Sequence, residues 1–111
     1  MYLYASMSQN DLRNSQILNT LSAHSLELTR FGVREIGLFG SYARGEAHAE
    51  SDIDIIVDME RERKTFRNFM ALSYYLEELF DRKVDLVTKQ SLSPYIGPHI
   101  LKTVQYASLT G

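Results

Sequence analysis

Cysteine is absent from the 111-residue sequence, which excludes a disulfide scaffold, a thiolate zinc site and a cysteine nucleophile. A basic excess is also absent, because 12 Lys and Arg face 14 Asp and Glu for a net charge of −2. Proteins that bind long nucleic acids replace counterions along the phosphates, so we expect no extended nucleic-acid binding. No segment approaches the roughly 20 apolar residues of a membrane span, and the first residues lack the pattern of a signal peptide. We therefore expect a cytoplasmic protein with no membrane partner.

What is present is typical of one small globular domain spanning residues 1–111. Hydrophobic residues make up 44% of the chain and charged residues 23%. Periodicity and turn residues predict an α/β (α+β) order of elements around a small sheet. The predicted ranges are a helix over 8–30 with a capping box at Ser8 and Asp11, a strand over 33–39 after a cap at Gly32, a turn opening a short helix over 40–45, a strand over 52–58, a charged run over 60–64, a helix over 65–80, a strand over 83–88, and helix starts at Pro94 and Pro98.

The two later helices carry more apolar residues than three strands readily cover. Thr65 is expected to cap the first of them. On or near the buried face of that helix lie Phe66, Phe69, Met70, Leu76 and Phe80. Ile100, Leu101 and Val104 follow at helical spacing. Amphipathic aromatic residues of the kind enriched at interfaces occur beside them, at Tyr74, Tyr75, Tyr95 and Tyr106. We expect an exposed apolar patch that binds a partner; the alternative is that these residues complete an ordinary core.

Three carboxylates carry the chemistry that the sequence predicts. Asp52 and Asp54 are two residues apart on a strand, so both project to one face with Cα atoms about 7 Å apart. Such a pair can bind hard cations, although it also occurs at ordinary solvated strand ends. Asp85 lies within the apolar run VDLV, where burial is costly without a cation or a hydrogen-bond partner. The alternatives for Asp85 are a pair with Lys83 or Arg82, or a place on an edge strand.

A glycine turn precedes the first two carboxylates. Gly40 and Ser41 follow the apolar strand directly, and a strand, a glycine turn and a helix start together favour anion binding by backbone N–H groups. Gly40 would allow close approach of a phosphate. Ser41 would donate its hydroxyl to a phosphate, or would serve only as a helix cap. Arg44 would contact a phosphate or pair with Glu46 or Glu50. His48 is expected to be a solvated loop residue.

The string GSYARGEAHAESDIDIIVD, with Asp85 as a third carboxylate, resembles the signature of the polymerase-β-type nucleotidyltransferase superfamily. It is most similar to the minimal nucleotidyltransferase (MNT) domains, which are typically antitoxins of HEPN/MNT toxin–antitoxin pairs. The resemblance extends over nearly the whole chain. It implies a polymerase-β-like palm with a mixed sheet of three or more strands and flanking helices.

The resemblance also implies a mechanism and a partner. Two Mg²⁺ ions would be held by Asp52, Asp54 and Asp85, while Gly40, Ser41 and Arg44 would contact the nucleotide. The activity would be transfer of AMP from ATP to a tyrosine of a HEPN-family RNase toxin, with Asp85 accepting the hydroxyl proton. Two alternatives stay open: an antitoxin that neutralises its toxin by binding alone, and a nucleotidyltransferase acting on a small, aminoglycoside-like molecule.

Overall fold

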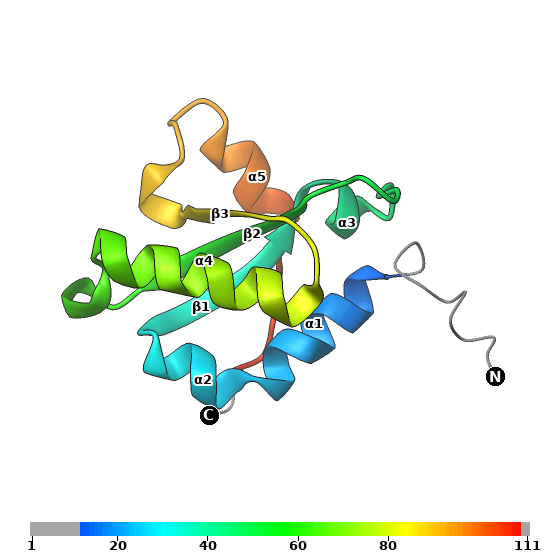
Figure 1. Cartoon of the computed structure of the whole chain (residues 1–111). Coiled ribbons are helices and arrows are strands. Elements are labelled where there is room, and N and C mark those ends of the chain that lie inside the picture. Colours follow the sequence, from blue (N-terminus) through cyan, green and yellow to red (C-terminus); the bar gives the residue numbers. More distant parts are fainter. Residues whose placement is uncertain (1–11, 110–111) are drawn as a thin grey trace, which may run out of the picture.

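Four strands form one mixed sheet in the order β3-β2-β1-β4 (Figure 1). The computed structural model describes residues 12–109. In chain order its elements are α1 Asn14–Ala23, α2 Ser25–Arg30, β1 Val33–Phe39, α3 Gly40–Arg44, β2 Ile53–Met59, η3 Arg61–Arg63, α4 Phe66–Phe80, β3 Val84–Thr88, η4 Lys89–Ser91, α5 Gly97–Thr103 and β4 Gln105–Tyr106. β1 pairs antiparallel with β2 and β4, whereas β2 and β3 run parallel. The predicted α/β order is confirmed, and β4 is an additional strand that no pattern indicated.

One face of the sheet carries the hydrophobic core. Alternate residues of β2, namely Ile53, Ile55 and Val57, point into it, as the strand pattern predicted. Three helices cover this face, α1, α2 and α4, and α5 lies on the other side of the sheet (Figure 1). The helices contribute the fully buried side chains Ile17, Leu21, Leu28, Leu72 and Leu76. By the same alternation the opposite face of β2 carries Asp54 and Asp58 together with the buried Ile56.

The first predicted helix is two helices. α1 ends at Ala23 and α2 begins at Ser25, whose hydroxyl donates to the Ser22 carbonyl oxygen at 2.6 Å. Such side-chain bonds to the backbone compete with the helical ladder, which accounts for the break. Gly32 follows α2 with φ +89°, as its predicted capping role requires. The capping box predicted at residues 8–11 lies outside the described residues.

α4 begins as predicted, and Leu76, Phe69 and Phe80 of its predicted buried face lie in the core or pack against it. The Thr65 hydroxyl accepts the Asn68 N–H at 3.1 Å, which confirms the predicted cap. Leu72 and Leu76 are fully buried, whereas Phe66 is 80% exposed. The prediction that Phe66 lies on or near the buried face was wrong: it stands on the first turn of α4 and lines a groove open to solvent.

The expectation of exposed aromatic residues is confirmed for three of the four tyrosines. Tyr74, Tyr95 and Tyr106 are exposed. Tyr75 instead packs on the core, with its ring centroid 5.3 Å from that of Phe31. The alternative, that all of these aromatic residues complete an ordinary core, is therefore wrong for Tyr74, Tyr95 and Tyr106.

The C-terminal helix has one of the two predicted starts. Pro98 occupies the first turn of α5, where its missing N–H costs nothing. No helix begins at Pro94, which lies in the preceding turn. Across residues 12–109, helices long and apolar enough to cross a membrane are absent.

Candidate active site

The three predicted carboxylates lie at the same end of the two parallel strands. Asp54 of β2 is in register with Asp85 of β3, and Asp52 directly precedes β2. Ile53 and Ile55 face the core, so Asp54 between them faces the opposite side of the sheet. The same alternation places Asp85 on that side, because Val84 and Leu86 belong to the core. The sheet therefore brings the carboxylates onto one face.

The surroundings of Asp85 differ from the prediction. Asp85 is exposed and β3 is an edge strand among the described elements, so this carboxylate is not buried at a cost. The edge-strand alternative thus describes its place. Within residues 12–109 the ion pairs are Arg44–Glu46 and Lys89–Glu35, so a pair of Asp85 with Lys83 or Arg82 is not formed. Its negative charge remains available at the site.

The electrostatics show that the three carboxylates affect one another. The pKa of Asp54 is raised from 3.8 to about 6, first by burial and then by the charges of Asp85 and Asp52. Arg44 acts in the opposite direction and lowers it. Protein cations thus compensate the negative charge incompletely, and a divalent cation would stabilise the ionised form.

Oxygen donors of this kind suit Mg²⁺, but the protein alone does not supply a complete ligand shell. In the described part of the chain, no three acidic or histidine side chains stand close enough together to hold a metal ion unaided. Mg²⁺ is usually bound by one or two carboxylates together with water and substrate phosphates, rather than by an all-protein cage. The donor set therefore fits a cation that arrives with a nucleotide.

The Gly40–Ser41 turn lies directly beside Asp54. Phe39, the last residue of β1, is the register partner of Asp54, so the chain turns into α3 next to this carboxylate. Gly40 has φ +75°, and a Cβ at this position would collide with Asp54 Oδ2. Glycine is thus required here by the backbone conformation and by the approach of the carboxylate, in addition to any role toward a phosphate.

Ser41 is not a helix cap. The N-cap position of α3 is Phe39, and no side chain caps this helix. The Ser41 hydroxyl forms no hydrogen bond to another group within residues 12–109. This removes the capping alternative and leaves the hydroxyl available to a ligand, whereas its contact with a phosphate remains a prediction.

The glycine turn and Asp54 line a cleft of about 530 Å³. Gly40, Ser41, Arg44 and Asp54 form one wall, and α5 forms the other through His99, Ile100 and Thr103. The sequence predicted a helix near Pro98 but gave no sign that it borders the site, because that contact depends on the return of the chain across the sheet. The contribution of α5 to the lining of the cleft was therefore not predicted.

Arg44 forms the predicted alternative pair with Glu46, and His48 is a solvated loop residue as predicted. Arg44 Nε donates to Glu46 Oε1 at 2.9 Å, and both side chains are largely exposed. Exposed pairs of this kind contribute about 0–1 kcal/mol, so a phosphate could replace the carboxylate. His48 lies in an exposed loop, where its Nδ1 accepts the Glu50 N–H at 3.4 Å, as expected for a solvated loop residue.

Side chains from three distant segments hold α3 in place. Tyr42 of α3 is buried, and its hydroxyl accepts a hydrogen bond from Arg82 Nη1. The Ala43 carbonyl oxygen accepts Gln105 Nε2 at 3.0 Å and Asn14 Nδ2 at 3.4 Å. A helix of five residues has few internal hydrogen bonds. The position of the glycine turn therefore depends on α1, β4 and the loop after α4.

Comparison with known proteins agrees with this geometry. The nucleotidyltransferase domain family matches residues 21–107. Protein adenylyltransferase MntA of Thermococcus cleftensis is 51% identical over 92 residues, covering 82% of this chain and 92% of that protein. A solved structure of a minimal nucleotidyltransferase has a TM-score of 0.67 and 34% identity, covering 79% of this chain and 93% of that one. A toxin–antitoxin crystal structure with AMP-PNP has a TM-score of 0.63 and 28% identity, covering 80% and 70%. The chain belongs to the nucleotidyltransferase domain family and is a nucleotidyltransferase of the minimal, polymerase-β-like type.

Proposed function

We propose that this chain is the antitoxin of a two-gene pair and transfers AMP from ATP to a tyrosine of its HEPN-family toxin. Three considerations support the proposal. A relative sharing 51% identity is named a protein adenylyltransferase. A similar structure is a toxin–antitoxin assembly with a non-hydrolysable ATP analogue. The signature from Gly40 to Asp58 resembles that of MNT antitoxins paired with HEPN toxins.

The observation that carries the proposal is the position of Asp54. Its carboxylate touches the Gly40 turn on one side and is in register with Asp85 on the other. A triphosphate held by the turn would therefore lie against the carboxylates. Mg²⁺, as two ions bound with the nucleotide, would neutralise the leaving pyrophosphate and activate the attacking hydroxyl.

The residues of the cleft would divide the reaction between them. The backbone N–H groups at Gly40 and the Ser41 hydroxyl would hold the β- and γ-phosphates, and Arg44 would exchange its pair with Glu46 for a phosphate oxygen. Asp85 would accept the proton of the tyrosine hydroxyl. The tyrosine oxygen forms a bond to the α-phosphorus while the bond to the bridging β-phosphate oxygen breaks, so pyrophosphate leaves.

The proposal is tested by mass spectrometry of the partner. The protein encoded beside this gene is incubated with the chain, ATP and Mg²⁺, and its intact mass and modified peptides are measured. We expect one or more AMP units on a tyrosine, and no addition when Asp52 and Asp54 are both changed to Asn.

The two alternatives give different results in the same assay. A partner that stays unmodified and is neutralised equally well by the double Asn variant would show that the protein acts by binding alone. Consumption of ATP with an aminoglycoside and not with the partner would show a small-molecule nucleotidyltransferase. Either result would refute protein adenylylation.

A further inference from the structure

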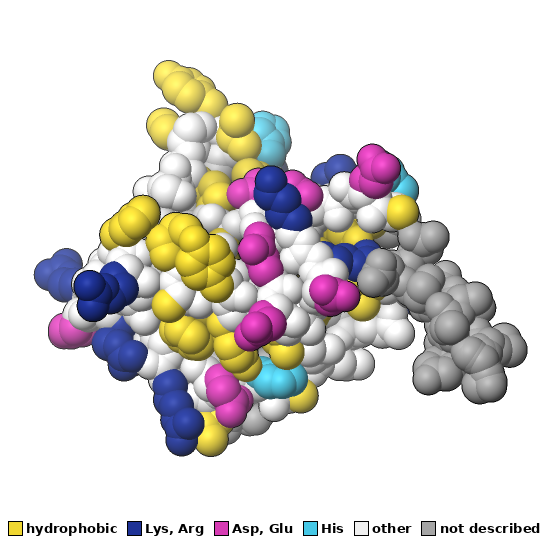
Figure 2. Space-filling view, viewed as in Figure 1, with side chains coloured by type: hydrophobic (Ala, Val, Ile, Leu, Met, Phe, Trp, Pro, Cys, Tyr) yellow, Lys and Arg dark blue, Asp and Glu magenta, His cyan; other side chains and the backbone are white. Residues whose placement is uncertain are grey.

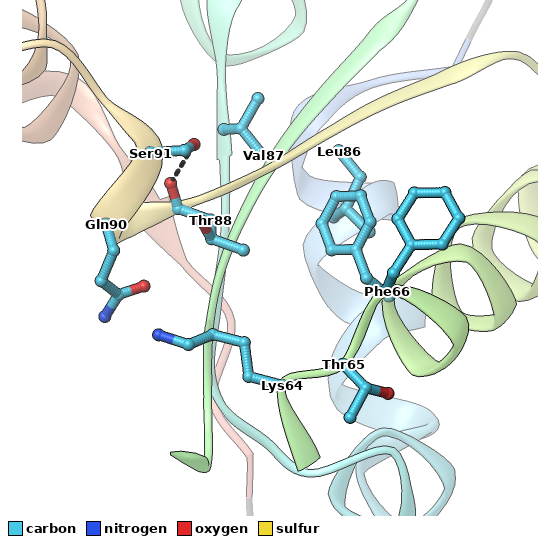
Figure 3. Close-up of a pocket in the computed structure, with 9 residues that line it drawn as sticks. Lys64, Thr65, Phe66, Leu86, Val87, Thr88, Gln90 and Ser91 are labelled. Carbon is cyan, nitrogen blue, oxygen red and sulfur yellow. Dashed lines mark hydrogen bonds between the residues drawn. The ribbon is translucent and has the colours of Figure 1, made fainter. Parts of the chain in front are cut away.

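A second surface hollow lies on the far side of Asp85 from the glycine turn. It is a groove of about 470 Å³ between the start of α4 and β3. Phe66 and Phe69 of α4 form one wall, and Leu86 and Val87 of β3 form the other. In Figure 3 the phenyl rings from the start of α4 and the side chain of Leu86 line the same groove, and the Lys64 side chain extends toward Gln90. The groove is apolar inside and polar at its rim.

The strand beside this groove has unpaired backbone groups. Ile53 N–H bonds to Lys83 O, so Asp85 and Val87 also turn their backbone groups toward β2. The alternate residues of β3 turn theirs to the free edge. At its two ends this edge is occupied, because Val84 N–H donates to Glu77 and the Thr88 carbonyl accepts Ser91 Oγ. Between them, the N–H and C=O of Leu86 have no partner within residues 12–109.

Basic residues gather at the start of α4, where Lys64 lines the groove, although the chain as a whole is acidic. Four of the seven residues from 61 to 67 are Arg or Lys: Arg61, Arg63, Lys64 and Arg67. All four are exposed, and in the described part of the chain none of them forms an ion pair, although Arg63 donates to the Arg30 carbonyl oxygen and Glu62 stands among them. Figure 2 shows this basic group beside hydrophobic side chains over the first part of α4 and β3. An occupant with negative charge would complement this surface.

The groove borders the strand that carries Asp85 of the candidate active site. Asp85 and Val87 project to the same face of β3, with Cα atoms about 7 Å apart. A polypeptide bound along the β3 edge would therefore place its neighbouring residues close to the carboxylates. An extended edge strand, an apolar groove and a basic rim together match strand addition by a peptide segment.

We propose that an extended acidic segment of the partner protein adds to the edge of β3, pairs with Leu86, and buries an apolar side chain against Phe66. The identity of this partner rests on the proposed function, while the chemistry of the segment follows from the groove. Docking at this edge would hold the partner while its acceptor tyrosine enters the cleft.

The test measures binding of the adjacent-gene protein without ATP, by titration calorimetry. We expect Phe66→Ala to weaken binding about 10- to 100-fold, the effect of losing one buried aromatic anchor. Lys64→Glu with Arg67→Glu should weaken it at least tenfold and reduce its salt dependence. Neither change removes a core contact, and acidic residues are favourable near a helix N-terminus, so the variants should fold.

Matched controls separate the groove from general surface effects. Tyr74→Ala removes an exposed aromatic residue from the same helix outside the groove, and Arg13→Glu with Arg34→Glu reverses two exposed charges elsewhere. Both should bind the partner as the unchanged chain does. If the controls weaken binding as much as the groove variants, or if the groove variants bind normally, the proposal is refuted.

Amide hydrogen exchange tests the strand pairing itself. The Leu86 amide should exchange quickly in the free chain and become protected in the complex, and a lack of protection would overturn strand addition. Tight binding of a single-stranded oligouridylate that competes with the partner would identify the groove as an RNA site instead. A partner that binds through the groove without gaining AMP would refute the proposed function alone, and a partner that gains AMP while the groove variants bind normally would refute the docking alone.

Discussion

Asp54 provides a direct test of the site's electrostatics through stability. Its pKa in the folded chain is raised to about 6 from 3.8. The folded state therefore holds this proton more tightly than the unfolded state, so folding stability falls as the pH rises from about 4 to 6. Above pH 6 the cost of the ionised carboxylate is present in full. Asp54→Asn, which removes the charge and keeps the shape, should stabilise the metal-free protein at pH 7.5.

The magnitude follows from the pKa difference. The whole difference would correspond to about 3 kcal/mol. Because the carboxyl group is only half-buried, solvent screens much of this interaction, and we expect about 1 kcal/mol. For a domain of this size that change raises the melting temperature by about 3 to 6 °C. A variant that inactivates the site should thus be more stable than the natural sequence.

Thermal unfolding followed by circular dichroism, in buffers from pH 4 to 7.5 with a chelator, measures the effect. Glu62→Gln is the control, since it removes one negative charge from an exposed turn. The advantage of Asp54→Asn should shrink below about pH 5 and vanish near pH 4, while the control stays flat. With Mg²⁺ and ATP, the unchanged chain should gain stability and the variant should gain little.

Two outcomes would refute this reasoning. A melting temperature of Asp54→Asn below that of the unchanged chain at pH 7.5 would mean that the carboxylate is compensated by the protein. An advantage that stays constant from pH 4 to 7.5 would mean that the effect comes from packing and not from charge.

Three further predictions concern the glycine turn. Ser41→Ala should leave the melting temperature unchanged, because the hydroxyl caps nothing, and should raise the KM for ATP about tenfold in an adenylylation assay. Gly40→Ala should cost about 1 to 3 kcal/mol in thermal unfolding as well as most activity, because φ is positive and the Cβ meets Asp54. Gln105→Leu should cost about 1 kcal/mol by removing a donor to Ala43, and should raise the KM for ATP more than it lowers kcat.

The sheet was predictable because its residues satisfy local rules. The strand over β1 was placed within its observed bounds, and β2 and β3 within one residue of theirs. Alternation then put Asp52 and Asp54 on the face away from Ile53 and Ile55, and this follows from the pleat alone. That Asp85 lies beside Asp54 depends on the parallel pairing of β2 and β3, which no local pattern in the sequence indicates.

The errors come from features that depend on distant contacts. Phe66 has the right spacing for a buried face, but its burial depends on how far the sheet extends beneath α4. Ser41 is a residue type that often caps helices, yet the N-cap position of α3 is Phe39, two residues earlier. β4 is only two residues long and pairs with β1 across most of the chain. Hydrophobic periodicity does not indicate which distant segments of the chain come into contact.

The two halves of the candidate site are held by different means, and this predicts how they respond to change. Asp54 and Asp85 are fixed by strand register, so displacing them requires disruption of the sheet itself. The glycine turn is instead held by Gln105 and Asn14 through the Ala43 carbonyl, from segments near the two ends of the chain. A partner that displaced β4 or α1 would therefore alter nucleotide binding while leaving the carboxylates in place. Substitution of Gln105 or Asn14 should therefore raise the KM for ATP, and substitution of Asp54 or Asp85 should lower kcat.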